Sequence, residues 1–323
     1  MPEGDTIRLA ASRIARVLAG REVVDARAPR ARDPSLRLVR TLVGRCCIGV
    51  HSHGKHLLVE FEGGLVLHSH LRMSGSWVVT ERSAADAGVR TGPSTRRRRE
   101  TTSRLWLELL TDKHAVRQYG GPVLELRSRA GAALALARVG LGPDILAADF
   151  DLETAVTRLA ALDRRLAIAD ALLDQRALSG IGNIWRAEAC FASGIDPFTP
   201  VGALTHDDLR TLVGRARELM LAAVATGSTR PRPVQVYSRA GRPCRVCGTA
   251  IAARRSGEQG RTIYWCPRCQ RRDARPAYAP TAGAEPVPGC ALHSAALPTG
   301  GVATAGTRGR KRSGQPTSLS RTR

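Results

Sequence analysis

Four cysteines in the last third of the sequence restrict the local fold more than any other feature. Cys244 and Cys247 form one Cys-x2-Cys pair, and Cys266 and Cys269 form a second pair eighteen residues later. Two such turns present four thiolates, which complete a tetrahedral zinc site without an open position. The spacing predicts one structural zinc ion in a hairpin too small to bury a core without metal. Redox pairing of the thiols is the alternative.

The charge balance of the 323-residue chain favours a polyanionic partner. The chain contains 50 Lys+Arg against 28 Asp+Glu, a formal net charge of +22, and its only lysines are Lys55, Lys113 and Lys311. Basic side chains release counterions from phosphates, so nucleic acid is the expected partner. No apolar run approaches the ~20 residues of a membrane span, and the N-terminus has no signal-peptide core. These features exclude the membrane and secreted classes and predict a cytoplasmic protein.

The first 130 residues have the pattern of a β-rich domain with one leading helix. Asp5 or Thr6 is placed to cap the helix, and Gly20 is placed to end it. Its apolar face is formed by Ile7, Ala10, Ala11, Ile14, Val17 and Leu18. Short strand-like runs follow. The runs 57–61 and 65–70 flank Glu62-Gly63-Gly64, which predicts a hairpin, and runs at 105–109 and 123–126 predict further strands.

The remainder divides into three parts. Residues 131–228 repeat apolar side chains at helix spacing, residues 229–272 contain the cysteine pairs, and residues 273–323 have the composition of a disordered basic tail. A polar stretch from 81 to 104, which contains Arg96-Arg97-Arg98-Arg99, interrupts the strands. We interpret it as a solvated, mobile insertion in preference to a dedicated DNA contact.

Two short segments carry chemistry. Gly180-Ile181-Gly182-Asn183 enters a helix, where exposed backbone amides form an anion site, although a purely structural cap has the same pattern. At the N-terminus, Met1 precedes a small residue, so its removal is expected to expose Pro2 as a free secondary amine followed by Glu3. An N-terminal amine has a pKa near ~8, so it is partly neutral and nucleophilic at cytoplasmic pH. Such an amine can attack a sugar C1′ and form an iminium ion.

Six separated motifs then occur in one order. They are Met1-Pro2-Glu3-Gly4-Asp5-Thr6, Gly54-Lys55-His56-Leu57-Leu58, His70 through Trp77, Leu141-Gly142-Pro143-Asp144, Leu173 through Arg186, and the terminal cysteine hairpin. Over about residues 2–270 they resemble the formamidopyrimidine-DNA glycosylase/endonuclease VIII family of bifunctional DNA repair enzymes. The resemblance implies an α+β multidomain fold, in which an N-terminal β-sandwich with a leading helix precedes a helical helix–two-turns–helix domain and a C-terminal zinc-finger hairpin.

The resemblance also implies roles for individual residues. Pro2 matches the Schiff-base nucleophile, and Glu3 matches the acid that protonates the leaving base or the sugar. Lys55 matches a lysine that contacts phosphate and assists β-elimination, for which arginine would be a poor proton donor. Arg261 matches the finger arginine that grips the lesion phosphate and assists δ-elimination, and Asn183 matches the phosphate-binding asparagine.

Three further residues are expected to contact DNA. Arg72 and Met73 lie in the loop that fills the hole left by a flipped-out nucleotide, and flipping is required because C1′ is blocked inside the stack. Arg138 is a looser match to another DNA-contacting arginine. His53 stands where the family often has an arginine, so the pattern lacks one phosphate contact.

Two features favour the endonuclease VIII-like branch of the family, whose substrates are oxidised pyrimidines. The chain starts Met-Pro-Glu-Gly, and only the segment 226–242 is available where the purine-specific branch has a long loop over 8-oxoguanine. Against this, Met73 resembles the wedge residue of the purine branch. We expect excision of oxidised pyrimidines followed by β,δ-elimination. Oxidised purines, 8-oxoguanine and formamidopyrimidines, are the alternative substrates.

The expected partner is double-stranded DNA containing oxidised bases or abasic sites, bound by a zinc-containing monomer associated with the bacterial nucleoid. Two other function classes fit part of the sequence. A non-catalytic damaged-DNA-binding protein needs the glycine turn, residues 180–183, and the zinc finger formed by the cysteine hairpin. It does not need Pro2, Glu3 or Lys55. A zinc-ribbon RNA-binding protein accounts for the charge and the finger and leaves the same three residues unexplained. Their presence favours the enzyme.

Overall fold

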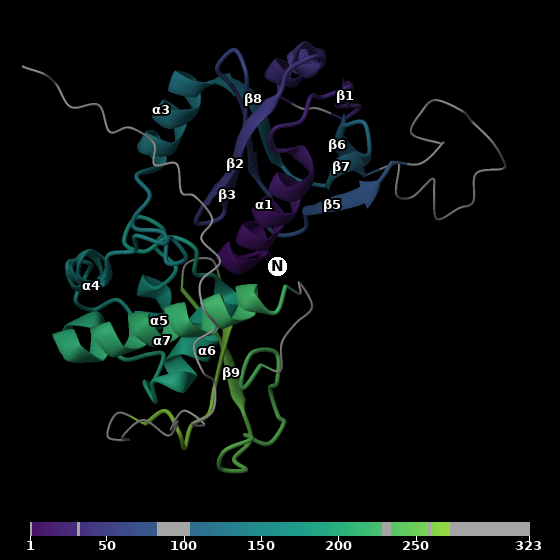
Figure 1. Ribbon diagram of the computed structural model, residues 1–323. Coiled ribbons are helices and arrows are strands. Elements are labelled where there is room, and N and C mark those ends of the chain that lie inside the picture. The colour runs from purple at the N-terminus through teal and green to yellow at the C-terminus, as the bar shows by residue number, and fades with distance from the viewer. Residues whose placement is uncertain (1, 31–32, 83–103, 228–233, 258–259, 272–323) are drawn as a thin grey trace, which may run out of the picture. The chain divides into compact units, whose positions relative to one another are not determined.

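Among the residues that the structure describes, eight antiparallel strands form two four-stranded sheets in the N-terminal part of the chain (Figure 1). The structure is a computed structural model that describes residues 2–30, 33–82, 104–227, 234–257 and 260–271. The strands are β1 Asp25–Arg27, β2 Cys47–His53, β3 His56–Phe61, β4 Leu65–His70, β5 Ser76–Glu81, β6 Leu105–Leu110, β7 His114–Tyr119 and β8 Val123–Ser128. The first sheet has the order β1-β6-β7-β5, and the second has the order β2-β3-β4-β8.

The leading helix, α1 (Gly4–Leu18), has the predicted apolar face, but the prediction of its cap is wrong. Glu3 occupies the cap position in place of Asp5 or Thr6, and its side chain makes no hydrogen bond to α1. The reason is that the Glu3 carboxylate is bonded to a different helix, described below. Beyond the last turn, Gly20 adopts a φ of +70°, which a glycine accepts without strain.

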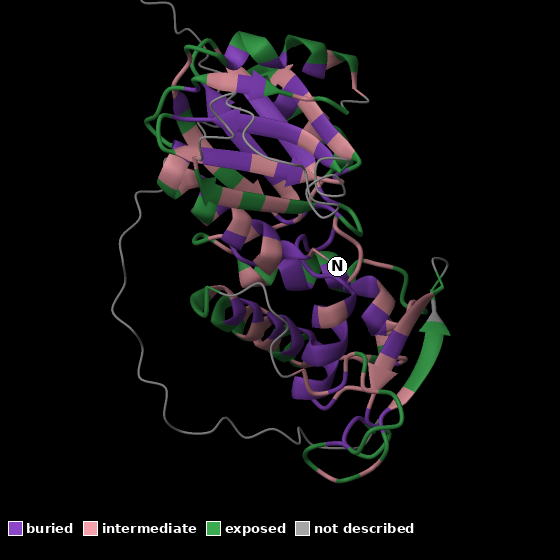
Figure 2. Cartoon of the chain, turned by 90° about the vertical axis from the view of Figure 1, so that its right-hand side faces the viewer, coloured by how far each residue is buried: buried purple, intermediate pink, exposed green. Residues whose placement is uncertain are grey.

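The two sheets pack face to face, since alternate residues of their strands point into one shared buried cluster. Figure 2 shows how many of the strand residues are buried. Leu57, Val59 and Phe61 of β3 lie in one buried cluster with Leu107 and Leu109 of β6. The predicted hairpin is confirmed: β3 and β4 pair antiparallel across the turn at residues 62–64. A 3-10 helix, η1 (Pro34–Leu42), adds apolar residues to the same core.

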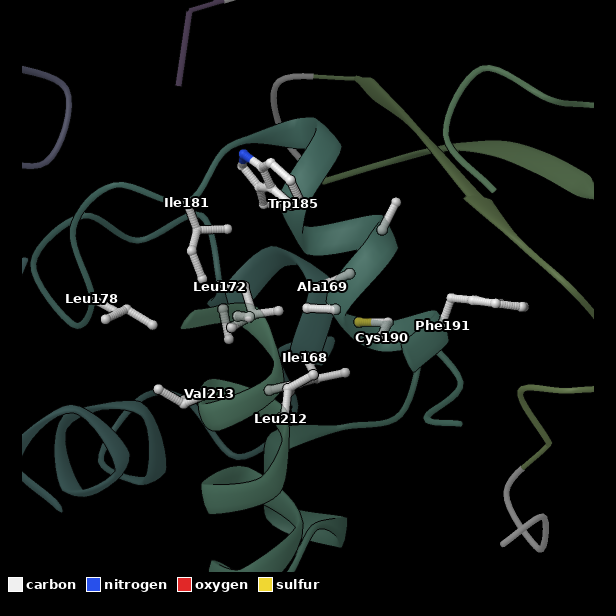
Figure 3. Packing of buried hydrophobic residues seen from close by; sticks show 14 of the residues in the cluster. Ile168, Ala169, Leu172, Leu178, Ile181, Trp185, Cys190, Phe191, Leu212 and Val213 are labelled. Carbon is white, nitrogen blue, oxygen red and sulfur yellow. The ribbon is translucent and has the colours of Figure 1, made fainter. Parts of the chain in front are cut away.

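Helices dominate the chain after β8, as the apolar spacing predicts. They are α3 Arg129–Val139, α4 Leu152–Ala160, α5 Ile168–Ala171, α6 Asn183–Ala192, the 3-10 turn η3 Val201–Ala203, and α7 His206–Ala225. α5, α6 and α7 share a second core, in which Ile168, Trp185 and Leu212 are packed together (Figure 3). A reciprocal capping box between Thr205 and Asp208 begins α7.

The cysteine segment is a hairpin of two strands, β9 (Ala252–Ser256) and β10 (Arg261–Trp265). Its Ile251 and Ile263 belong to the same buried cluster as α6 and α7, so the hairpin is packed on the helices. The α3 helix, by contrast, contacts β8 and β4. The domain limits at 130, 228 and 272 stay predictions.

Several sequence predictions lie outside the described residues: the removal of Met1, most of the arginine-rich insertion with the run 96–99, and the tail 273–323. Among the described residues, no helix is both long and apolar enough to cross a membrane.

Candidate active site and cysteine cluster

The carboxylate of Glu3 is bonded to the first turn of α6. Glu3 is 1% exposed, and it accepts backbone N–H bonds from Gly182 (2.9 Å), Ile184 (2.8 Å) and Trp185 (3.3 Å). A helix start leaves such amides unpaired and carries a partial positive charge, so a carboxylate is a stabilising partner there. The glycine turn is therefore an anion site, as its pattern predicts, but it binds a side chain of the same protein. Pro2, which adjoins Glu3, is thereby held at this helix start.

Burial and hydrogen bonding act on the protonation of Glu3 in opposite directions. Burial raises the pKa of the Glu3 carboxyl, while the charge of Lys55 and the backbone bonds from Ile184 and Trp185 lower it. The net direction is upward. A carboxyl with a raised pKa holds a proton more readily than an exposed glutamate, which suits Glu3, beside the N-terminal residue, to proton transfer.

Lys55 also contacts the turn that binds Glu3. Gly54, with a φ of +55°, forms the tight turn between β2 and β3, and its backbone lies against Ser179 and Gly180 with no room for a side chain. The Lys55 ammonium donates a hydrogen bond to the backbone carbonyl of Ile181. Burial lowers the pKa of Lys55 to about 8; the charge of Glu3 opposes this shift, and that of Arg261 adds to it. Lys55 therefore exchanges its proton close to physiological pH.

Gln175 holds the glycine turn in shape. Its side-chain amide donates to the Ile181 carbonyl at 3.0 Å, and its carbonyl oxygen accepts from the Gly180 N–H at 3.1 Å. The turn also meets the N-terminus directly, because the Gly4 N–H donates to the Gly180 carbonyl at 2.9 Å. Gln175 lies within the Leu173–Arg186 motif, and nothing else in the sequence indicates this task.

Asn183 and Arg261 meet where α6 contacts the cysteine hairpin. The Asn183 amide donates to the backbone carbonyl of Thr262 at 3.0 Å. Arg261, the first residue of β10, is half-buried, and its carbonyl accepts a long bond from Arg186 at 3.5 Å. Glu3 and Lys55 thus meet at the turn that begins α6 with Asn183, Arg261 is close enough to affect the pKa of Lys55, and Pro2 adjoins Glu3 in the sequence.

Arg186 and Asp170 form a buried ion pair that sequence analysis missed. The Arg186 side chain is 0% exposed and donates to the Asp170 carboxylate at 2.7 Å. Arg186 lies one turn after Asn183 on α6, so both side chains reach the backbone of β10. Its only sequence signal was its place at the end of the Leu173–Arg186 motif.

The three residues predicted to contact DNA lie on exposed segments. Arg72 and Met73 are in the loop between β4 and β5; Arg72 has a left-handed φ of +48°, and Met73 is 63% exposed. The neighbouring Leu71 is buried in the sheet core and anchors the loop. Arg138 is exposed in the last turn of α3, whose main contacts are with the second sheet.

The four paired cysteines converge as their spacing predicts. Their sulfur atoms lie within 4.8 Å of one another, and the Cys247–Cys266 and Cys244–Cys269 sulfur distances are 3.4 and 3.9 Å. Four thiols at these distances, without a disulfide among them, fit a single tetrahedral metal ion. The side chain of Gln270 joins the cluster to the loop that follows α6, because it accepts from the Cys266 N–H and donates to the Ile195 carbonyl.

The sequence matches known proteins over the segments that carry this site. The N-terminal domain description of formamidopyrimidine-DNA glycosylase matches residues 1–117, and its H2TH domain matches residues 141–232. A probable endonuclease 8 2 from Streptomyces coelicolor is 39% identical over 279 residues, which cover 84% of this chain and 94% of that protein. The chain belongs to the formamidopyrimidine-DNA glycosylase/endonuclease VIII family.

Members of both branches of the formamidopyrimidine-DNA glycosylase/endonuclease VIII family are similar to the chain. The endonuclease 8 2 of Mycobacterium tuberculosis is 40% identical and the formamidopyrimidine-DNA glycosylase of Methylococcus capsulatus is 32% identical, each over 84% of this chain and 100% of its own length. The solved Lactococcus lactis formamidopyrimidine-DNA glycosylase, bound to DNA with an AP site, has a TM-score of 0.70 at 22% identity, over 84% of this chain and 100% of that one. The predicted family, fold class and enzyme class, DNA glycosylase and AP lyase, are confirmed.

Proposed function

We propose that the protein removes oxidised pyrimidines from double-stranded DNA and then cleaves the strand at the abasic site, with Pro2 as the nucleophile. The observation that supports this most is the burial of Glu3 between the α6 helix start and Lys55, directly after Pro2. A protein that only binds damaged DNA has no need of a buried carboxyl with a raised pKa beside a terminal amine.

In the proposed reaction, the Pro2 nitrogen attacks C1′, the C1′–base bond breaks, and the base leaves with a proton from Glu3 or solvent. The proton on the Pro2 nitrogen passes to the Glu3 carboxylate. Glu3 then gives a proton to O4′ as the C1′–O4′ bond breaks, which opens the sugar ring and leaves an iminium ion between Pro2 and C1′. A base removes a proton from C2′ and the 3′ phosphate leaves by β-elimination; loss of a proton from C4′ then expels the 5′ phosphate by δ-elimination. Water hydrolyses the iminium and frees Pro2.

Lys55, Asn183 and Arg261 are proposed to serve the phosphates and the eliminations. With a pKa of about 8, Lys55 is largely charged at neutral pH, which suits a phosphate contact, and it still releases its proton readily to a leaving group. Asn183, whose amide donates to the Thr262 carbonyl and also lies within hydrogen-bond reach of the Tyr237 hydroxyl, is the proposed partner of a phosphate oxygen. The guanidinium of Arg261 offers bidentate donors to the phosphate beside the lesion.

Exposed side chains are proposed to hold the distorted duplex. Met73 and Arg72 stand on a loop whose left-handed backbone presents them to solvent, which suits side chains that enter the space of a flipped nucleotide. Arg138 is proposed to contact the DNA backbone at the end of α3. Since one chain carries the whole cluster, a monomer is sufficient for the chemistry.

Zinc is the proposed occupant of the cysteine cluster. Cys244, Cys247, Cys266 and Cys269 would hold it with no position left for substrate, so its task is to stabilise the hairpin that carries Arg261.

Borohydride trapping tests the function directly. Reduction converts the iminium to a stable protein–DNA adduct, so we would compare duplexes with thymine glycol, 8-oxoguanine or an abasic site. We expect an adduct on thymine glycol that maps to Pro2, and Pro2→Gly is expected to cripple trapping while DNA binding persists. An adduct on 8-oxoguanine alone would favour the alternative oxidised-purine substrate, which Met73 supports. Absence of any adduct would favour a non-catalytic damaged-DNA-binding protein.

A further inference from the structure

The outer face of the β2–β3–β4–β8 sheet carries an unusual row of histidines. Strand residues alternate between the two faces, so the neighbours of the buried Leu57 and Leu67 point away from the sheet core. The pairing register places His56 opposite both His53 and His70. The histidines on this face are His51, His53, His56, His68 and His70. The proposed reaction uses none of them.

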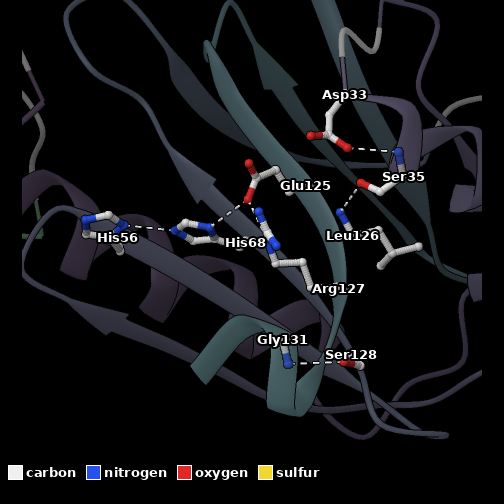
Figure 4. Close-up of polar contacts among 9 residues, drawn as sticks. All are labelled: Asp33, Ser35, His56, His68, Glu125, Leu126, Arg127, Ser128 and Gly131. Atoms are coloured by element: carbon white, nitrogen blue, oxygen red, sulfur yellow. Dashed lines mark hydrogen bonds and ion pairs between the residues drawn. The ribbon is translucent and has the colours of Figure 1, made fainter. Parts of the chain in front are cut away.

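Three of the side chains on this face form a continuous hydrogen-bonded chain with an arginine at its far end (Figure 4). Nδ1 of His56 is 2.9 Å from Nε2 of His68, and Nδ1 of His68 is 3.4 Å from the carboxylate of Glu125. Arg127 donates to the same carboxylate oxygen at 2.7 Å. The chain crosses three strands, from β3 through β4 to β8.

The chemistry of these groups fixes the direction of every bond. An ionised carboxylate only accepts, so Nδ1 of His68 carries the hydrogen that faces Glu125. A neutral His68 then has a bare Nε2, which accepts, and Nδ1 of His56 must donate to it. His56 is therefore left with a hydrogen on Nδ1 and an unprotonated Nε2.

Charge and burial on this face favour neutral imidazole rings for His56 and His68 and an ionised carboxylate for Glu125. The hydrogen bond from Arg127 lowers the pKa of Glu125. Burial, together with the neighbouring His70, His68, His53 and Lys55, lowers the pKa of His56 to about 3. Burial likewise lowers the pKa of His68, although Glu125 opposes this. At neutral pH, His56 therefore donates its hydrogen bond to His68, and His68 donates its own to Glu125.

His56 is joined to two segments of the proposed site. It directly follows Lys55 in the sequence, and its ring makes an edge contact with the His70 ring at 4.7 Å between centroids. Nδ1 of His70 accepts the backbone N–H of Arg72 at 3.1 Å, which leaves the His70 hydrogen on Nε2. This series of hydrogen bonds therefore connects Glu125 on β8 to the turn that carries Lys55 and to the Arg72–Met73 loop.

We propose that Glu125 and His68 are positioning residues for strand cleavage. Through the directed chain they fix the ring orientation and the tautomer of His56, and thereby hold the Lys55 turn and the Arg72–Met73 loop in register. The rate of strand cleavage then depends on the Glu125 carboxylate, although this group contacts none of the reacting atoms. The kinetic part of this proposal rests on the proposed function, but the tautomers do not.

The first measurement therefore uses the zinc-loaded, full-length wild-type protein without DNA. Two-bond ¹H–¹⁵N correlation spectra report which ring nitrogen of each histidine carries hydrogen, and single His→Gln variants assign the signals. We expect hydrogen on Nδ1 of His56 and His68 and on Nε2 of His70. Hydrogen on Nε2 of His56, or a mixture of its tautomers, would overturn the proposal.

The second measurement compares Glu125→Gln with Glu60→Gln. Glu60 is a matched control, because it lies on the same sheet face and also contacts one arginine and one histidine, at 3.1 and 3.8 Å. In Glu125→Gln we expect mixed His56 tautomers and single-turnover cleavage of an abasic duplex slowed by about tenfold or more. The dissociation constant for a tetrahydrofuran-site duplex should change by less than about twofold.

Melting curves and borohydride trapping separate the outcomes. If Glu125→Gln cleaves as fast as wild type, or if Glu60→Gln slows cleavage equally, Glu125 has no positioning role and the proposal fails. If wild-type protein forms no adduct at Pro2, the proposed function fails, while the tautomer result still decides the existence of the directed chain. If Glu125→Gln loses its fold, His68→Gln is measured in its place, and unaltered cleavage by that variant would overturn the proposal.

Discussion

Glu3 and Gly182 are packed so closely that no other residue fits at position 182. A Cβ built on Gly182 would lie 2.7 Å from Cγ and 2.6 Å from Oε1 of Glu3, although the Gly182 backbone, with a φ of −128°, is open to any residue. The requirement for glycine is therefore a requirement for space. A substitution at position 182 therefore displaces the Glu3 carboxylate without straining the backbone of residue 182 itself.

Gly182→Ala is expected to abolish most base excision with a moderate loss of stability. The added methyl group pushes Glu3 from the helix start, so both the carboxylate and the adjoining Pro2 move from the cluster. Single-turnover excision should fall by about a hundredfold. Gly214→Ala in α7 is the control, because a Cβ there meets nothing within 4 Å. It should stabilise the protein by about 0.5–1 kcal/mol and leave excision unchanged.

The Glu3→Gln variant distinguishes two tasks of the Glu3 side chain: proton transfer and hydrogen bonding to the start of α6. The amide keeps the shape but cannot supply a proton, so excision should fall on the order of a hundredfold. Stability should fall by about 1–3 kcal/mol, since the amide accepts the backbone N–H bonds poorly. Glu188 is a matched carboxylate that accepts backbone bonds from Gln235, Val236 and Tyr237. Equal loss of excision in Glu188→Gln would show that capping alone explains the effect.

Lys55 should make stability depend on pH in the alkaline range. Its pKa is lowered from 10.5 to about 8 in the folded protein, so between these values the unfolded chain binds more protons. Folding stability contributed through Lys55 must therefore rise as pH increases from 8 to 10.5. Urea denaturation of wild type and Lys55→Met at pH 7.5 and pH 9.5 measures this difference. The exposed Lys113→Met serves as the control, and an identical pH response in all three proteins would contradict the prediction.

Arg186→Met should damage both stability and the finger. It removes the buried ion pair between Arg186 and Asp170, which costs about 3–5 kcal/mol, and it removes a contact to the Arg261 backbone. The loss is measured by chemical denaturation, together with affinity for abasic-site DNA. Arg176→Met, which breaks an exposed pair with Asp174, should leave the melting temperature unchanged. Similar melting temperatures for the two variants would contradict the buried-pair argument.

Cys266→Ala should unfold the hairpin and weaken DNA binding. Three thiolates hold zinc less tightly than four, and the hairpin has little apolar core of its own. We expect about one zinc per wild-type chain by elemental analysis and substoichiometric zinc in the variant. Cys190→Ala is the control, because Cys190 is a free, buried cysteine of the helical core. Full DNA affinity in a zinc-free wild-type protein would contradict a structural task for the metal.

Sequence analysis predicted the features that depend on local patterns. The β3–β4 hairpin, the amphipathic α1 and the convergence of Cys244 with Cys269 all follow from spacing along the chain. Motif order was sufficient to bring Lys55 and Glu3 to one site. These agree because short-range periodicity and ligand spacing survive in any tertiary context.

Long-range partners escaped the same reasoning. The cap of α1 was misassigned because the Glu3 side chain bonds a helix that begins 180 positions later in the chain. The Arg186–Asp170 pair and the His68–Glu125 contact join residues whose surroundings in the sequence carry no signal of pairing. Only the register of the strands and the packing of helices determine which charged groups meet.

The bond from Gly182 to Glu3 joins residues 179 positions apart. Closing so large a loop has an entropic cost that is recovered only when the helices after β8 have folded. During synthesis, both sheets can therefore form while the N-terminal amine is still unplaced. If Pro2 is the nucleophile, as proposed, a chain with a complete sandwich but unfolded helices is expected to lack activity, because the helix start that binds Glu3 has not yet formed. The proposed nucleophile would then meet DNA only after the helices that position its neighbour have folded.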